Sequence, residues 1–182
     1  MLQEAIDSLG IRDVYLRDSE SYLVDGFEPK YDPDVDTMDV QFQHVVTESS
    51  VLEVEDNGEV PARLFRVFIR LGARLVMPIE SDDQAKPVLD TDRASNKTCA
   101  DPADPSRVRA LISAMMVAEY DLTGDPSTDA LKAFALRNAS YHVWPYWREF
   151  LASQCVRMNL RKVVLPAVQF ARRSETDSTS QH

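Results

Sequence analysis

The amino-acid sequence predicts an α+β fold, in which a four-stranded antiparallel sheet is followed by helices. Four segments with strand-like alternation follow one another with no helical period between them, and apart from a short stretch at the start of the chain, helical spacing begins only after residue 126. Asn57-Gly58, between the second and third segments, is typical of the tight turn of an antiparallel hairpin. The chain has 182 residues, of which 44% are hydrophobic. This length and composition fit one globular domain.

The beginning of the chain is predicted to hold a short helix, a strand and a long loop. Residues 1–10 form a helical extension, because their apolar side chains fall on one side of a helix. Alternation over residues 11–18 predicts the first strand. Residues 22–36 are rich in Pro, Gly and Asp, which predicts a loop, although the segment holds more apolar side chains than a solvated loop needs.

The other three strands differ in how their apolar residues are distributed. The second strand covers residues 38–46, with a short continuation at 51–55 before the turn. The third, at 62–77, is the clearest, because one face is apolar and the other carries arginines (Phe65, Val67, Ile69, Leu71, Ala73 and Leu75 against Arg66, Arg70 and Arg74). The fourth, at about 108–122, is apolar on both faces. We expect either a helix on each face of the sheet or a second subunit packed against it.

Two segments are predicted to be disordered. Residues 80–106 are polar and have no periodicity, which indicates an insertion within the domain. Residues 171–182 are polar in the same way and form a tail. The folded domain is therefore expected at 11–170.

Two helices complete the chain. Ser127 or Thr128 can cap the first, and the second runs from about residue 140 to 158. Residues 141–151 hold two Trp, two Tyr and one Phe. These rings go around the helix, so packing on one side leaves some of them outside. Surplus aromatic surface of this kind is typical of an interface or of a groove for apolar ligands.

Composition and motifs exclude several functions. A net charge of −10 argues against binding to nucleic acid. No segment has the signal-peptide pattern or enough apolar residues to span a membrane, so we expect a cytoplasmic protein without membrane insertion. The three histidines lack metal-ligand spacing, the two cysteines are far apart, and five glycines can hardly build a phosphate-binding loop. We therefore expect no metal, no cofactor, no catalytic residue and no enzyme activity.

Charge is distributed unevenly along the chain. Residues 1–60 hold sixteen acidic residues against three basic ones, whereas the remainder is mildly basic. The acids fall on the first strands and their loops, and many of the bases fall on the third strand and the aromatic helix.

The aromatic helix resembles that of SecB-type protein-export chaperones. The similarity runs without gaps over residues 144–170 and is carried by an aromatic residue before Pro145-Tyr146, by Arg148-Glu149, and by later positions (Ser153, Arg157, Leu165, Val168 and Phe170). Weaker matches occur in the predicted strands, at Val14-Tyr15, Asp39-Val40 and 119–124 among others. The resemblance covers roughly residues 11–79 and 107–170.

The resemblance implies a fold, an assembly and a function. SecB has a four-stranded antiparallel sheet with helices on one face and assembles as a tetramer, a dimer of dimers. Members hold unfolded polypeptides in apolar grooves without ATP, and many deliver preproteins to the SecA translocase. The client-binding residues implied here are Val40, Phe42, Leu131, Phe134, Trp144, Trp147, Phe150 and Leu151. Asp18, Glu20 and Leu111 correspond to the translocase face, where Ser113 replaces an acidic residue of the family. By the same resemblance, we expect the acidic first strands to face solvent and a partner, and the bases of the third strand and the aromatic helix to lie beside the groove.

Three differences from export chaperones suggest a narrower group. The second C-terminal helix of SecB is missing, and the insertion at 80–106 and the N-terminal extension are additional. All three features resemble SecB-like chaperones of toxin–antitoxin systems, which protect an aggregation-prone antitoxin. Export and antitoxin protection both remain open at this point, as does a non-catalytic adaptor that binds one folded partner through its aromatic patch. Trp147 lies either in the groove or in the core.

Overall fold

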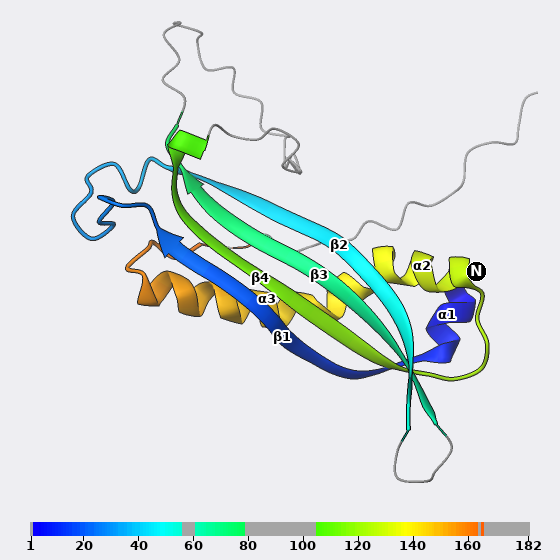
Figure 1. Ribbon diagram of the computed structural model, residues 1–182. Coiled ribbons are helices and arrows are strands. Elements are labelled where there is room, and N and C mark those ends of the chain that lie inside the picture. The colour runs from blue at the N-terminus through cyan, green and yellow to red at the C-terminus, as the bar shows by residue number, and fades with distance from the viewer. Residues whose placement is uncertain (1, 56–60, 79–104, 164, 166–182) are drawn as a thin grey trace, which may run out of the picture.

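Four long strands and two main helices build the molecule (Figure 1). The computed structural model describes residues 2–55, 61–78, 105–163 and 165. Within these residues the elements are, in chain order, α1 (Leu2–Ser8), β1 (Leu9–Leu23), β2 (Asp39–Val54), β3 (Ala62–Val76), the 3-10 turn η1 (Pro105–Arg107), β4 (Val108–Leu122), α2 (Thr128–Arg137) and α3 (Ala139–Arg157).

The four strands form one antiparallel sheet in the order β1-β4-β3-β2. The hairpin predicted from Asn57-Gly58 is confirmed, because β2 and β3 pair from Asp39 opposite Val76 to Val54 opposite Ala62. β4 lies between β3 and β1. The predicted α+β architecture is therefore correct, with β1 and β2 as the two edge strands.

Both edge strands are longer than the sequence predicted. β1 begins at Leu9, within the predicted helical extension, and continues to Leu23. β2 is one strand of 16 residues, where two pieces were expected. The polar stretch between these pieces does not break the strand, because backbone pairing with β3 continues across an irregularity between Val46 and Glu48. An edge strand tolerates polar side chains since one of its edges meets solvent.

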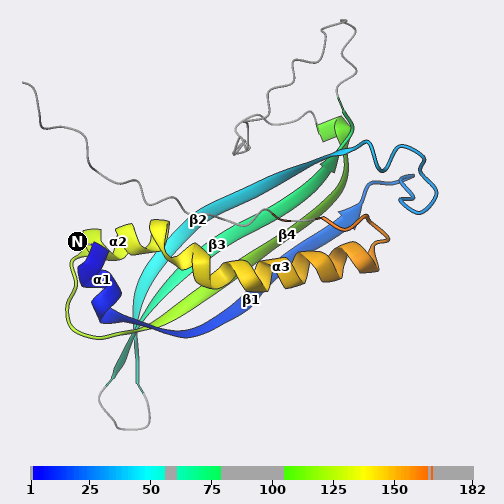
Figure 2. The same cartoon turned by 180° about the vertical axis from the view of Figure 1, so that it is seen from behind.

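The helices cover one face of the sheet, which we call the inner face (Figure 2). The apolar face predicted for β3 is confirmed, with Phe65, Val67, Ile69, Leu71, Ala73 and Leu75 all buried. α3 meets this face through Val143, Trp147, Leu151 and Cys155, which are about one turn apart and all about 1% exposed. The hydrophobic core therefore lies between α3 and the two central strands.

The N-terminal extension is integrated into the fold through α2. Ala5 of α1 is fully buried, and the carboxylate of Glu4 accepts a hydrogen bond of 2.9 Å from the backbone N–H of Ser127. Of the two caps proposed for α2, Ser127 is used, because its hydroxyl accepts a hydrogen bond from Ala130 N–H. α1 therefore stabilises the start of α2.

The two-sided apolar character of β4 does not require a helix on each face. On the outer face, which the helices leave uncovered, Val117 is 0% exposed. Its neighbours across the sheet are Tyr15 of β1 and Phe68 of β3, and the guanidinium of Arg17 lies 5.3 Å from the centre of the Phe68 ring. Large side chains of the flanking strands thus bury much of the outer face of β4 within a single chain. A helix on each face is therefore not what covers this strand, whereas a second subunit packed against the sheet stays a prediction.

The two segments predicted to be disordered lie outside the described residues. This applies to the tail at 171–182 and to 80–104 of the insertion. The last residues of the predicted insertion, Pro105 and Ser106, belong to η1 and lead directly into β4. That end of the predicted boundary was therefore placed two residues too late.

Candidate functional site

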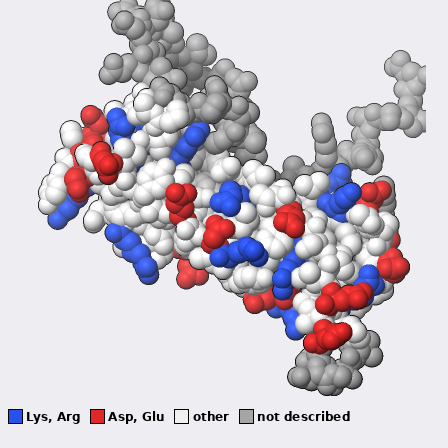
Figure 3. Space-filling model, in the orientation of Figure 1, with Lys and Arg blue, Asp and Glu red and all other residues white. Residues whose placement is uncertain are grey.

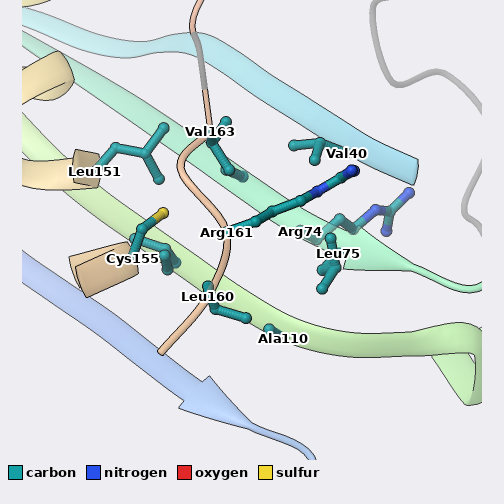
Figure 4. Close-up of a pocket in the computed structure, with 11 residues that line it drawn as sticks. Val40, Arg74, Leu75, Ala110, Leu151, Cys155, Leu160, Arg161 and Val163 are labelled. Carbon is teal, nitrogen blue, oxygen red and sulfur yellow. The ribbon is translucent and has the colours of Figure 1, made fainter. Parts of the chain in front are cut away.

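An apolar pocket lies on the inner face between the end of α3 and strands β2, β3 and β4 (Figure 4). Its free space is small, leaving about 20 Å³ in which the centre of a water molecule can move, room for about one water. The lining side chains are almost all apolar (Val40, Ala73, Leu75, Ala110, Ile112, Leu151, Cys155, Leu160 and Val163, with Arg74 and Arg161).

The chain itself closes this pocket after α3. We call residues 158–163 and 165 the return segment. Asn159 has a left-handed backbone conformation with φ of 52°, which asparagine tolerates better than most residues. The N–H of Leu160 then donates to the carbonyl of Cys155 at 2.9 Å. This turn ends α3 and sends the chain back across the sheet (Figure 2).

Arg161 fixes the return segment to the loop between β1 and β2. Its guanidinium donates one hydrogen bond of 2.8 Å to the carbonyl of Asp36 and a second to the carbonyl of Met38. The adjacent Leu160 packs against a small cluster that includes Phe27 and Met38. This cluster explains why the predicted loop at 22–36 carries apolar residues. Phe27 of the loop is buried together with Met38, which follows the loop.

Cys155 belongs to the packing of the pocket. Burial raises the pKa of its thiol, an effect that exceeds the opposing influence of a backbone hydrogen bond from Val163. The thiol is therefore protonated at neutral pH and is a poor nucleophile. The interpretation of Cys155 as a small buried side chain agrees with this environment.

The eight predicted client-binding residues divide by exposure. Leu131, Phe134, Trp147 and Leu151 are buried in the core, of which Trp147 is 1% exposed. Val40, Phe42, Trp144 and Phe150 are partly exposed and pack against the edge of the core. Of the two positions considered for Trp147, the structure places it in the core, where its ring stacks on Phe150 at 6.0 Å.

Trp144, Val40 and Phe42 border the pocket side of the inner face. Trp144 precedes Leu151 by seven residues and therefore lies on the same stripe of α3 as this pocket residue. Val40 and Phe42 are two residues apart on β2, so both face inward, opposite Leu75 and Ala73 of β3. The indole N–H of Trp144 is buried and has no hydrogen-bond acceptor among the described residues. Such a buried donor is costly to leave unpaired.

The predicted translocase-facing residues lie on the outer face. Asp18 and Glu20 are exposed, and Asp18 is 3.8 Å from the guanidinium of Arg70. Leu111 lies on the central strand β4 and is partly buried. Ser113, two residues further along β4 and on the same face, is buried. The structure thus brings these residues onto one surface, on the opposite side of the sheet from the pocket.

Acidic and basic side chains alternate over this outer face (Figure 3). Arg66 of β3 pairs with Glu119 of β4 at 2.6 Å, and Arg12 of β1 pairs with Asp121 at 2.8 Å. Arg66 and Arg70 lie on the side of β3 that faces away from the helices, where Glu119 and Asp18 match their charge. For these two arginines, the expectation of a place beside the groove is therefore wrong. Arg74 does line the pocket, and its guanidinium donates a hydrogen bond of 2.7 Å to the side-chain oxygen of Gln41.

Two histidines connect the helices with the sheet. His44 Nε2 of β2 lies 2.7 Å from the hydroxyl of Ser140, at the start of α3. His142 Nδ1 lies 2.9 Å from the hydroxyl of Tyr120, which is fully buried in β4. Burial lowers the pKa of His142 and raises that of Tyr120. Both are therefore neutral at pH 7 and contribute to packing.

Sequence reasoning missed the residues of the return segment. Leu160, Arg161 and Val163 line the pocket, but their part of the sequence showed only an apolar stretch interrupted by Pro166. The available signal was a pair of basic residues, Arg161 and Lys162, within an otherwise largely apolar stretch after the helix. No helix in the described ranges is long and apolar enough to cross a membrane. Across the same ranges, no three metal-ligating side chains come together.

Comparisons with known proteins identify the fold. No family model matches this chain, and no curated protein matches it. Among solved structures, a SecB-like chaperone of Mycobacterium tuberculosis in complex with a ChAD peptide from the HigA1 antitoxin is similar. The similarity has a TM-score of 0.56 and covers 92% of this chain and 93% of that one, at 15% identity. The chain therefore has a SecB-like fold, as the resemblance over residues 144–170 implied.

Proposed function

We propose that this protein, with its SecB-like fold, is an ATP-independent chaperone that holds an unfolded segment of an antitoxin. The observation that carries the proposal is the partly exposed apolar border of the inner face, formed by Val40, Phe42 and Trp144. The antitoxin peptide bound by the mycobacterial chaperone supports this choice of client.

The geometry suits a holdase for physical reasons. Apolar side chains can accept many unfolded sequences, because hydrophobic contacts are not directional. The charged outer face keeps the protein in solution while the inner face is occupied. Phe150 lies on the other flank of α3 from Trp144 and extends the apolar border.

The first experiment measures suppression of aggregation. A chemically denatured, apolar-rich protein is diluted into buffer with and without the chain, and light scattering is followed without nucleotide. We expect scattering to fall as the chain approaches the concentration of the client. Unchanged scattering at a severalfold excess of the chain would contradict the holdase proposal.

A second experiment separates the possible clients. Capture of bound proteins from the source cell distinguishes an antitoxin from preproteins and the SecA translocase. Enrichment of an antitoxin is the expected result. Enrichment of SecA would instead support export and would assign Asp18, Glu20 and Leu111 to its contact. We place the protein in the cytoplasm, where each of these clients is synthesised.

The alternative is an adaptor for one folded partner. The exposed side of the helices favours it, because Leu136, Tyr141, Tyr146 and Val156 are between 46% and 78% exposed. A short unfolded peptide distinguishes the two functions. The peptide should displace a client that occupies the inner face of the sheet. It should not displace a folded partner bound to the exposed, solvent-facing side of α3.

A further inference from the structure

We propose that the return segment is a built-in competitor, which occupies the apolar inner face and must be displaced before a client binds there. This inference rests on the proposed function, because it concerns access to the same surface. It identifies Leu160, Arg161 and Val163 as the part of the chain that controls this access.

The return segment lies where a client would lie. Leu160 and Val163 line the pocket together with Val40, Leu75 and Ile112, which are side chains of the sheet (Figure 4). The small remaining space indicates that the segment nearly fills the site. The apolar surface beside Val40 is therefore covered by the protein's own chain.

The segment is held by few hydrogen bonds and by the burial of Leu165 in the core. It has no regular secondary structure, and Leu160, Arg161 and Val163 remain partly exposed. Its hold on the β1–β2 loop consists of the two hydrogen bonds from Arg161 to backbone carbonyls, with apolar contacts of Leu160. Segments with few hydrogen bonds open more readily than the strands below them.

An intramolecular competitor lowers the apparent affinity for a client. Only the open fraction of the protein binds, so the apparent dissociation constant rises as this fraction falls. Loss of Arg161 removes charge-assisted hydrogen bonds that favour the closed form. Arg161→Ala should therefore tighten client binding by about tenfold, the effect of losing a typical hydrogen bond from a charged donor.

The experiment measures opening and client binding separately. Opening is followed by the rate at which a thiol reagent labels Cys155, in a Cys99→Ser background so that a single thiol reports. Client binding is followed by fluorescence anisotropy of reduced, carboxymethylated α-lactalbumin, which cannot refold. Arg157→Ala is the matched control, because Arg157 is an exposed arginine at the end of α3.

We expect Arg161→Ala to label Cys155 faster and to bind the unfolded probe about tenfold more tightly, with the control unchanged. Circular dichroism that matches the parent excludes misfolding as the cause. Faster labelling with unchanged or weaker probe binding would overturn the competitor and leave the proposed function intact. Unchanged labelling would also overturn it, since Arg161 would then not hold the segment. Absence of probe binding in every variant would overturn the proposed function itself.

Discussion

At the level of single residues, position around α3 decides which aromatic side chains stabilise the fold. Trp147 is directed at the sheet and is fully enclosed, whereas Trp144 lies on the flank and is partly exposed. Tyr146 is 48% exposed on the opposite flank. The sequence predicted that some of these rings would remain outside, but it left open which ones.

Replacement of Trp147 should destabilise the protein. Trp147→Ala removes a large, fully buried ring, and the expected loss is about 3–5 kcal/mol in the free energy of unfolding. Urea denaturation followed by circular dichroism measures it. A midpoint within error of the parent would mean that the ring is not part of the core.

Trp144→Phe is the matched control on the flank of the same helix. It retains a ring but removes the indole N–H that has no acceptor among the described residues. We expect the free energy of unfolding to change by less than about 1 kcal/mol, because loss of ring volume is offset by removal of a buried unpaired donor. Affinity for an unfolded probe should fall. If Trp144→Phe and Trp147→Ala had the same effects on probe binding and on stability, this would contradict the separate positions of the two rings.

His142 should make the stability depend on pH. Burial lowers its pKa below the ordinary value of 6.5, so the unfolded chain binds a proton more readily than the folded one. The contribution to stability is complete above about pH 6.5 and is lost as the pH falls towards the lower, folded-state pKa. Thermal unfolding of the parent and of His142→Gln, in steps of about 0.5 pH unit between pH 7.5 and pH 5, measures this contribution. A variant with the same pH dependence as the parent would contradict this assignment.

At the level of elements, the strength of the pattern decided what the sequence could predict. β3 was predicted nearly to its ends, because a buried central strand with one helix-covered face gives an unbroken apolar alternation. β1 and β2 lie at the edges, where half of the positions meet solvent, and their lengths were underestimated. Their neighbours in the sheet determine how far they extend.

The start of α2 offers a test of the local signals. Ser127→Ala removes the cap that accepts from Ala130 N–H and should cost about 1 kcal/mol of stability. Thr128→Ala is the control, since Thr128 is exposed and already within the helix. Chemical denaturation of both variants measures the difference. Equal losses would show that the hydroxyl of Ser127 contributes little as a cap.

At the level of the whole molecule, the sheet separates two surfaces of different character. The outer face carries interspersed acidic and basic side chains, some of which form ion pairs. The helical side leaves Leu136, Tyr141 and Val156 exposed beyond the core. Apolar side chains gathered on one side are typical of a surface that meets another protein.

These exposed side chains favour self-association through the helical side. We expect a tetramer, with a mass about four times the 20.6 kDa of the chain. Multi-angle light scattering at micromolar concentration measures the mass. Tyr146→Asp should lower it, since a buried charge at a subunit interface is costly. A monomeric mass for the parent would contradict this assembly.

The sequence by itself determined the fold class, the order of the strands along the chain, the antiparallel hairpin and the burial of β3. These follow from local periodicity and turn chemistry, which each segment carries alone. Tertiary structure decided which rings of α3 are enclosed, that Arg66 of β3 pairs with Glu119 on the outer face, and that Arg161 holds the chain across the pocket. Each of these depends on contacts between segments far apart in the chain, and no local pattern encodes which distant segment meets which.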